Sequence, residues 1–600
     1  MRKVTTQVDG SPGEDPPPKK EGTRYGVTPA STLNTQHFLF QPDMSQAEAS
    51  SGSPESLEEN TPQATESTQS QHSYQLNPDA GLKPYQITLI TVGGAVNSGL
   101  LIGLGDALSR SGPASILISY TFVGFIVFIV LSALGEVASF SREPTTLHSQ
   151  AKQFCGPSLG FTLGWIYWLK YMMVIINQIT AGIMVLSFWT KLGAGQEIAY
   201  ITVFLCVIFS MNYWSGRFLG RYEVLISSFK IAIVLGLMIL SIVIAFGGGP
   251  NHKKGFRYWR RPGAFANEED RTALGVFRAI FRTFPATTLS YLGTELIGMA
   301  VLHTRDSRKA AARAIQQTFY RILAFNLVIV TLLGMAIPYD EDVLELSIYT
   351  SKRKAMAFVV AVQMAHVTVL PDILNGCILI FVVSSASRAL CMATRIIREL
   401  SFEKNAPRFL RRANKRGVPV YALGVSFAPA FLGFLNLLST SGRLWAYLVN
   451  LVTMFSILTW ISILIVHISF GHFRKTHQIP PEDVPFKAPF GILGSWVALV
   501  LCISIPLMRA IELSDNNFYS KGLDVGAFVT SFLGIPLYFA LVLGYKAVYR
   551  RRRRRARMKA PALPTRVRSL DTETDGAGLG RTTTREKALW RSRIIPVWLI

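Results

Sequence analysis

Long apolar segments constrain the fold of this chain more than any other feature of its sequence. A membrane-spanning helix needs about 20 predominantly apolar residues, and about twelve such segments follow one another along the chain. With positive mean hydropathy and 16% charged residues, the chain is too apolar for a soluble multidomain protein. The sequence therefore predicts an all-α polytopic membrane protein. The segments, numbered 1 to 12 in this order, are Tyr85–Leu108, Ala114–Ser139, Leu159–Trp189, Glu197–Tyr213, Glu223–Phe246, Gly275–Leu302, Thr318–Pro338, Pro371–Ile397, Tyr421–Leu438, Trp445–Phe470, Gly491–Ile511 and Val525–Tyr549.

The chain is expected to divide into three parts. Residues 1–80 are rich in Ser, Thr, Pro, Gln and Glu and lack apolar periodicity, which is typical of a disordered tail. Residues 81–550 form the predicted membrane domain, because short loops join most of the segments. Residues 551–600 form a basic C-terminal tail. Both tails are expected in the cytoplasm, where trafficking or ubiquitination machinery is a candidate partner.

Basic residues in the short loops predict the orientation of the chain in the membrane. Cytoplasmic loops carry an excess of Lys and Arg, and the loops after segments 4, 6, 8 and 10 share that excess. The net charge of +24 therefore reflects topology rather than a nucleic-acid-binding surface. One outer loop, which contains Lys253 and Lys254, is also basic but does not invert four consistent loops. The basic residues of those four loops are Arg217, Arg221, Arg305, Arg308, Lys309, Arg313, Arg408, Arg411, Arg412, Lys415, Arg416, Arg474 and Lys475.

Glycine-containing breaks in segments 1 and 6 predict the binding site. Residues Gly93–Gly99 interrupt segment 1, and Tyr291–Glu295 interrupt segment 6. Unwound backbone at membrane depth is tolerated where it lines a cavity, and the start of a half-helix attracts a carboxylate. Breaks five segments apart predict a LeuT-like inverted 5+5 repeat with two further C-terminal helices. The alternative for each break is a close helix crossing at small residues.

Five ionisable residues lie in or near apolar segments, where a charge costs about 2.5–3.5 kcal/mol on insertion scales. Such a residue is functional, or it belongs to a structural ion pair. Function is favoured for Glu295, because it follows the second break. Lys170 and Arg388 would favour an acidic substrate if they faced the cavity, whereas pairing with Glu136 or Glu295 would make them neutral scaffolding. The five residues are Glu136, Lys170, Lys230, Glu295 and Arg388.

The sequence contains no pattern typical of an enzyme. Its histidines show no ligand or nucleophile spacing, its five cysteines are scattered in or beside apolar segments, and a phosphate-binding glycine–lysine loop is missing. We therefore expect no catalytic residue, no metal site and no cofactor. Any transport is expected to be secondary.

Short motifs between residues 255 and 490 carry a family resemblance. Gly293–Leu296 lies at the break of segment 6, and Leu448–Asn450 with Trp460 lies in segment 10. Through these motifs the chain resembles a fungal amino-acid permease of the amino acid–polyamine–organocation superfamily over residues 81–550. The other motifs are Gly255–Trp259, Pro262–Phe265, Asn405–Pro407, Arg416–Pro419 and Pro485–Phe490.

The resemblance implies how substrate and ion would be bound. The backbone of Gly93–Gly99 would hold the α-carboxylate of an amino acid, and carbonyl groups around Ser290 would hold its α-ammonium. Lys230 matches a family lysine that stands where sodium-coupled relatives bind Na⁺, so the driving ion would be H⁺. The candidates are, for substrate binding, Gly93, Gly94, Val96, Asn97, Ser98, Gly99, Leu289, Ser290, Tyr291, Gly293 and Thr294; for proton coupling or gating, Glu136, Lys230 and Glu295; and for specificity, Lys170, Gln178, Ser387 and Arg388.

Departures from the family pattern leave three functions as hypotheses. Asn97 stands in place of a loop glycine, Gln178 in place of a glutamate, and Ser387–Arg388 in place of an Asn–Ser pair. The first hypothesis is a plasma-membrane symporter that imports an L-amino acid with protons by alternating access, with the lipid bilayer around it. The second is a permease-like sensor that binds an amino acid without turnover. The third is a carrier of another amine, such as choline, GABA or a polyamine.

Overall fold

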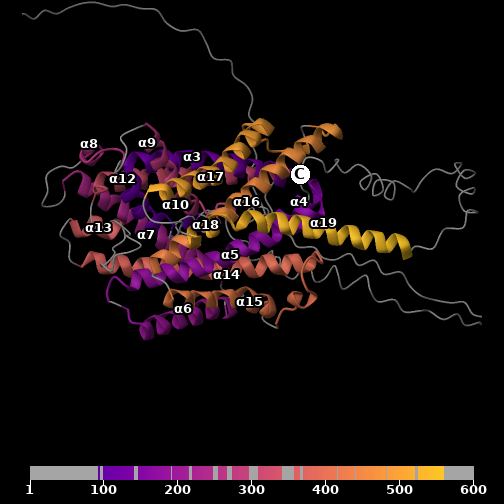
Figure 1. The fold of residues 1–600 in the computed structure, drawn as a ribbon, viewed down its shortest axis with the longest axis horizontal. Coiled ribbons are helices and arrows are strands. Elements are labelled where there is room, and N and C mark those ends of the chain that lie inside the picture. The colour runs from indigo at the N-terminus through magenta and orange to yellow at the C-terminus, as the bar shows by residue number, and fades with distance from the viewer. Residues whose placement is uncertain are drawn as a thin grey trace, which may run out of the picture. The chain divides into compact units, whose positions relative to one another are not determined.

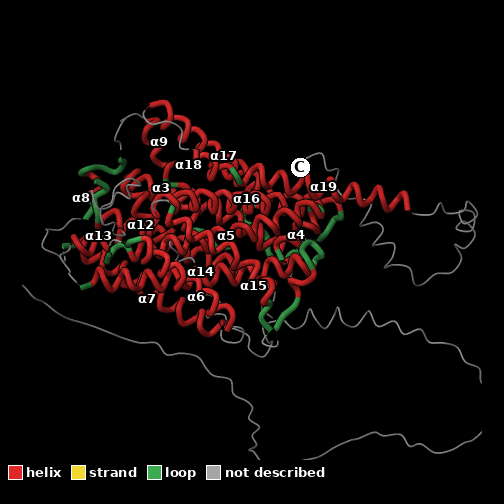
Figure 2. Tube along the Cα trace, turned by 60° about the horizontal axis from the view of Figure 1, so that its bottom comes forward, coloured by secondary structure: helices red, strands yellow, loops and turns green. Residues whose placement is uncertain are grey.

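The computed structural model describes residues 89, 92–94, 99–140, 146–190, 192–214, 219–247, 255–266, 273–295, 308–340, 357–364, 369–414, 417–438, 441–480, 483–519 and 525–559. All of these residues belong to one unit, Ser70–Ile600. Within the described ranges the regular structure is entirely helical, with short turns and no strand (Figure 2). The expectation of an all-α protein is therefore confirmed.

The helices of the described chain coincide in sequence with the predicted apolar segments and with short stretches between them. They are η2 (Gly99–Gly103), α3 (Leu104–Phe140), α4 (Leu147–Phe154), α5 (Pro157–Leu186), α6 (Ala194–Trp214), α7 (Leu219–Ala245), α8 (Arg257–Arg260), α9 (Ala273–Arg282), α10 (Phe284–Ser290), α12 (Arg308–Ala336), α13 (Ala357–Met364), α14 (Leu370–Phe402), η3 (Arg408–Arg411), α15 (Val420–Phe427), η4 (Ala428–Leu437), α16 (Ser441–Thr476), α17 (Gly491–Tyr519), α18 (Val525–Phe532) and α19 (Gly534–Lys559).

Ten helical stretches among the described residues are long and apolar enough to cross a membrane. One of them, Gly99–Phe140, contains the second half of segment 1 and all of segment 2. The other nine correspond to segments 3, 4, 5 and 7 to 12, and segment 6 is divided between α9, α10 and a turn. The twelve predicted segments are thus consistent with the ten observed stretches.

A turn at Gly112 separates the helices of segments 1 and 2. Gly112 has a φ of 80°, which a side chain would strain, and Pro113 begins the helix that follows. The loop near Ala264 covers this turn, because the Ala114 N–H donates to the Ala264 carbonyl at 2.9 Å. The Ala266 N–H donates to the Ser111 carbonyl at 3.1 Å. The backbone groups freed by the turn are therefore satisfied by protein.

Helices that occupy equivalent positions in the two predicted repeats lie in contact. The segment 3 helix α5 packs along the segment 8 helix α14, and Figure 1 shows them side by side with α6 and α15 along one flank. The same holds for η2 with α10, α3 with α12, and α6 with η4. Two repeats related by a pseudo-two-fold axis are expected to pair in this way.

The helices differ in how far they are enclosed. Helices α5 and α16 bury most of their side chains, whereas α6, α7 and α19 expose many apolar ones. Leu225 on α7, for example, is 70% exposed. Apolar exposure on that scale is unfavourable in water and is expected for a surface that contacts lipid. The enclosed helices α5, α14 and α16 form the scaffold around the candidate site.

Candidate functional site

Both predicted breaks lie where the described helices end. In segment 6, α10 ends at Ser290 and a turn follows over residues 291–295, with Gly293 at a φ of 87°. Such a φ is left-handed and favours glycine, so the chain leaves the helix there. In segment 1, residues 92–94 are helical and η2 begins at Gly99. The predicted ligands Val96, Asn97 and Ser98 lie outside the described residues.

Two glycines at the first break allow neighbouring helices to approach closely. A Cβ atom on Gly93 would lie 2.5 Å from the Cβ of Ser227 on α7. A Cβ atom on Gly99 would lie 2.8 Å from the carbonyl carbon of Leu289 on α10. The close-crossing alternative therefore describes Gly93 and Gly99 directly. It also brings the two breaks together, since Gly99 packs on the last residues of α10.

The carbonyl groups predicted to hold an ammonium are partly engaged. The Leu289 carbonyl accepts from the Leu292 N–H at 3.2 Å, and the Tyr291 carbonyl accepts from the Thr294 hydroxyl at 2.9 Å. The Tyr291 carbonyl also accepts from the Thr294 N–H at 3.4 Å, and the Leu289 carbonyl from the Tyr291 N–H, so a ligand ammonium would have to share or replace these bonds. The Ser290 hydroxyl instead lies 2.7 Å from the Tyr120 hydroxyl and ties α10 to α3.

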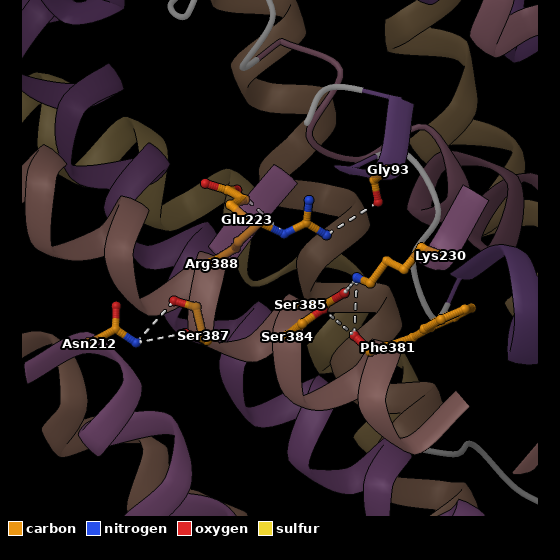
Figure 3. Close-up of polar contacts among 9 residues, drawn as sticks. All are labelled: Gly93, Asn212, Glu223, Lys230, Phe381, Ser384, Ser385, Ser387 and Arg388. Carbon is orange, nitrogen blue, oxygen red and sulfur yellow. Dashed lines mark hydrogen bonds and ion pairs between the residues drawn. The ribbon is translucent and has the colours of Figure 1, made fainter. Parts of the chain in front are cut away.

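Lys230 projects from α7 onto α14 (Figure 3). Its side chain is fully buried, and Nζ donates to the Phe381 carbonyl at 3.3 Å and the Ser385 hydroxyl at 3.2 Å. Nζ also lies 5.5 Å from the centre of the Phe381 ring. An ammonium held by a carbonyl and a hydroxyl occupies oxygen ligands of the kind that a sodium ion uses. The Lys230 ammonium therefore lies among oxygen acceptors between α7 and α14.

Arg388 lies one helical turn beyond Ser385 and points toward the first break (Figure 3). Its Nη2 atom is 3.5 Å from the Gly93 carbonyl oxygen, and its Nε is 4.0 Å from Oε1 of Glu223 on α7. A Cβ atom on Gly94 would lie 3.0 Å from Nη1 of Arg388. Glycine at position 94 thus provides room for the guanidinium.

Ser387, the neighbour of Arg388, points to a different helix. Its hydroxyl and its carbonyl accept from the Asn212 amide on α6, at 3.0 Å and 3.2 Å (Figure 3). This pair of bonds fastens α6 to α14. The two residues that replace the family's Asn–Ser pair therefore have separate surroundings, and only Arg388 faces the first break.

Lys170 on α5 forms an ion pair with Glu295 in the turn of the second break. Both side chains are buried, at 0% and 2% exposure, and Nζ lies 4.8 Å from the Tyr167 ring centre and 5.2 Å from that of Tyr171. Aromatic faces stabilise a nearby ammonium. Of the two alternatives for Lys170, the structure therefore has the paired one. Gln178, about 12 Å further along α5, is buried, and its amide oxygen has no partner among the described residues.

Glu136 lies near the end of α3, and three groups donate to its carboxylate. They are the Ala488 N–H at 2.8 Å, Arg474 Nη1 at 3.0 Å and His467 Nε2 at 3.1 Å. The other ring nitrogen of His467 lies 2.7 Å from the Ser495 hydroxyl on α17. The carboxylate thus joins α3, α16, α17 and the segment before α17. Three donors on one buried carboxylate are typical of an anchoring group.

Comparison with known proteins identifies the family. The sequence model of the amino acid permease family matches residues 86–558. The dicarboxylic amino acid permease of Saccharomyces cerevisiae is 37% identical over 481 residues, which are 78% of this chain and 77% of that protein. The proline-specific permease of the same yeast is 31% identical over 481 residues, covering 78% and 75%. The chain belongs to the amino acid permease family. Membership, together with the ten apolar helical stretches, makes the permease an integral membrane protein and supports a role in amino acid transport.

Several partners in this permease were not found by sequence reasoning. Glu223 lies seven residues before Lys230, a spacing that places both on one face of α7, and its ion pair is with Arg388 on α14. Arg474 was interpreted only as a marker of topology, and His467 only as one of several unclustered histidines. Their contacts with Glu136 join residues more than 300 positions apart, so no local pattern reveals them.

Proposed function

We propose that this permease imports an amino acid together with protons across the plasma membrane by alternating access. Both termini would lie in the cytoplasm, with residues 1–80 and 551–600 as tails. Helices around the two breaks would move against the α5–α14 scaffold and expose the site to one side at a time. The binding residues would be backbone groups of Gly93, Gly94 and Gly99 and of the α10 end.

The observation that carries this proposal is the packing of the two breaks against each other. Gly99 lies against Leu289 at the end of α10, so the start of one half-helix meets the end of another. The start of a half-helix offers N–H groups to a carboxylate, and the end of one offers carbonyls to an ammonium. An α-amino acid carries both groups on one carbon atom, as this arrangement requires.

Proton coupling is supported by the position of Lys230. Its ammonium is hydrogen-bonded to the Phe381 carbonyl and the Ser385 hydroxyl, and a sodium ion at the same oxygens would meet a fixed positive charge. A carrier without that sodium site needs another driving ion. Protons are available at the plasma membrane, where one charge moving inward gains about 2.3 kcal/mol per 100 mV.

An acidic amino acid is the substrate class that we propose within this function. One relative is named a dicarboxylic amino acid permease. In addition, Arg388 lies beside the first break, and the carboxylate paired with it among the described residues is 4.0 Å away. A dicarboxylic amino acid would enter a cell against an inside-negative potential, so its uptake requires at least one proton for electroneutrality.

Uptake by yeast that lacks its own major permeases tests the function. Cells with and without this chain receive a panel of labelled amino acids, with and without a proton uncoupler. We expect uncoupler-sensitive uptake that is strongest for aspartate and glutamate. Lys230→Met, expressed to the same surface level, is the matched control and is expected to lose uptake.

Other outcomes would favour the remaining hypotheses. Binding of an amino acid to surface-expressed protein without uptake would indicate a sensor and contradict the symporter. Uptake of choline, GABA or a polyamine in preference to amino acids would indicate an amine carrier. Uptake that persists in full with the uncoupler would exclude proton coupling.

A further inference from the structure

Arg388 is a cation whose contacts with the described residues are few and long. A guanidinium has five N–H donors, and charge-assisted hydrogen bonds are about 2.7–2.9 Å long. The contacts of Arg388 that involve described residues are longer, with 3.5 Å to the Gly93 carbonyl and 4.0 Å to Glu223. The side chain is 19% exposed, and that of Glu223 is 24% exposed. The pair is therefore close enough to attract but too far apart to satisfy the guanidinium.

The charges beside the first break leave one positive charge in excess. Gly93 packs on Ser227, which lies one turn before Lys230 on α7, and Arg388 contacts Gly93 from α14. Lys230 and Arg388 are two cations, and Glu223, which pairs with Arg388, is the one carboxylate paired with either of them in the described structure. Lys170 does not add to this excess, because Glu295 contacts it directly.

An acidic amino acid complements that excess. At neutral pH it carries two carboxylates and one ammonium, which gives a net charge of −1, whereas a neutral amino acid would leave the positive charge uncompensated. The planar fork of a guanidinium matches a carboxylate through two parallel hydrogen bonds, which the longer contacts with Glu223 and Gly93 do not provide. A Cβ atom at position 94 would lie 3.0 Å from Nη1, so glycine there leaves room beside the guanidinium.

We propose that Arg388 binds the second carboxylate of an acidic substrate, and that Glu223 is the counterion which this carboxylate displaces. The proposal deepens the function above and rests on it for the presence of an amino acid at the break. It assigns specificity to Arg388 and excludes Lys170, whose pair with Glu295 is closed. Glu223 keeps the guanidinium in position in the empty site and competes with the ligand for it.

Ligand-induced thermal stabilisation of the purified full-length protein measures binding without requiring transport. We expect Arg388→Gln to weaken aspartate binding by about 10- to 100-fold, because the side-chain carboxylate of the bound aspartate loses a charged hydrogen-bond donor. Asparagine has the same size as aspartate but no side-chain charge, so it does not make the contact that Arg388→Gln removes. Its affinity for Arg388→Gln should be within about twofold of its affinity for the wild-type protein. Arg388→Lys should recover only part of the loss, because an ammonium cannot form the bidentate pair.

Glu223→Gln provides an independent arm if Arg388→Gln folds poorly. Removing the competing carboxylate should tighten aspartate binding by about two- to fivefold and leave asparagine binding unchanged. Equal losses for aspartate and asparagine in Arg388→Gln would show that Arg388 only fastens segment 1 to α14, and would overturn the proposal. So would a wild-type protein that binds asparagine more tightly than aspartate. Binding of aspartate without uptake in cells would instead refute the transport function and leave the role of Arg388 standing.

Discussion

Two cation–carboxylate pairs lie beside the two breaks, and they differ in how completely each cation is satisfied. At the second break, Lys170 contacts Glu295 directly between two tyrosine rings, and both residues are buried. At the first break, Arg388 and Glu223 are 4.0 Å apart, and their side chains are 19% and 24% exposed. The Lys170–Glu295 pair resembles a structural connection between α5 and the segment 6 turn. The Arg388–Glu223 pair resembles a site that binds a ligand.

The difference follows from burial and from side-chain geometry. A buried charge is costly unless it is paired, so Lys170 and Glu295 stabilise the fold only together. A partly exposed pair at 4 Å contributes little and is easily exchanged. Functional sites retain such incompletely satisfied groups because a ligand can then supply the missing interaction. The same comparison predicts which substitutions change stability and which change binding.

Breaking the buried pair should have the largest effect. Lys170→Met leaves Glu295 as an unpaired buried charge, and Glu295→Gln does the same to Lys170. Each single substitution should destabilise the protein by about 3–5 kcal/mol, whereas the double variant should recover most of that loss. Thermal unfolding of the purified proteins measures all three. Single variants as stable as wild type would contradict the assignment of this pair as scaffold.

Removing the charge of Glu136 should have the next largest effect. Its carboxylate accepts three hydrogen bonds from α16 and the segment before α17, so Glu136→Gln should cost about 1.5–3 kcal/mol. Arg474→Gln is the matched control, because Arg474 is 27% exposed and should cost less. Glu136→Gln thus tests whether the number of hydrogen bonds to a carboxylate, rather than its distance from the breaks, sets the cost of removing it. A selective loss of aspartate binding with unchanged stability would contradict an anchoring role.

Of the substitutions at Glu295, Glu136 and Glu223, the one at Glu223 should change stability least. Glu223→Gln removes an interaction across 4.0 Å between partly exposed groups, which is worth at most about 1 kcal/mol. Its thermal unfolding should therefore match wild type closely in the absence of ligand. A loss as large as that of Glu295→Gln would show that both pairs are structural, and the contrast between them would disappear.

The helices could be predicted from sequence because membrane insertion imposes a simple rule. About 20 apolar residues and the loops between them identify a spanning helix without knowledge of its neighbours. Both breaks were also visible, since glycines in an apolar helix are a local signal. The Gly112 turn lay between two predicted segments, so the continuous stretch Gly99–Phe140 changes the description rather than the architecture.

The partners of the charged residues were not predictable, because ion pairs depend on how distant helices pack. Lys170 and Glu295 are 125 positions apart, and sequence reasoning left both Glu136 and Glu295 open as partners. Glu223 was not considered as a partner of Arg388, although it shares a helix face with Lys230. The role of Ser387 also depended on its rotation toward Asn212, which no motif encodes.

The pair of Glu403 and His148 lies at the end of α14, and its contribution to stability should be the smallest and should depend on pH. Glu403, just beyond the end of α14, lies 3.2 Å from His148 on α4. Burial raises the pKa of Glu403, but hydrogen bonding and the charges of His148 and Lys152 outweigh it and hold the pKa below 4.5. A carboxyl group with a depressed pKa stabilises the folded state above its unfolded pKa, and this stabilisation is lost as the pH falls through the folded value.

Glu403→Gln should thus cost about 0.5 kcal/mol or less at neutral pH, and the difference from wild type should shrink as the pH falls below 4.5. Thermal unfolding over a pH series measures this difference, and one that grows toward acid pH would contradict the sign. Because the pair lies away from both breaks, aspartate binding at neutral pH should not change, which distinguishes it from the exchangeable pair at Arg388.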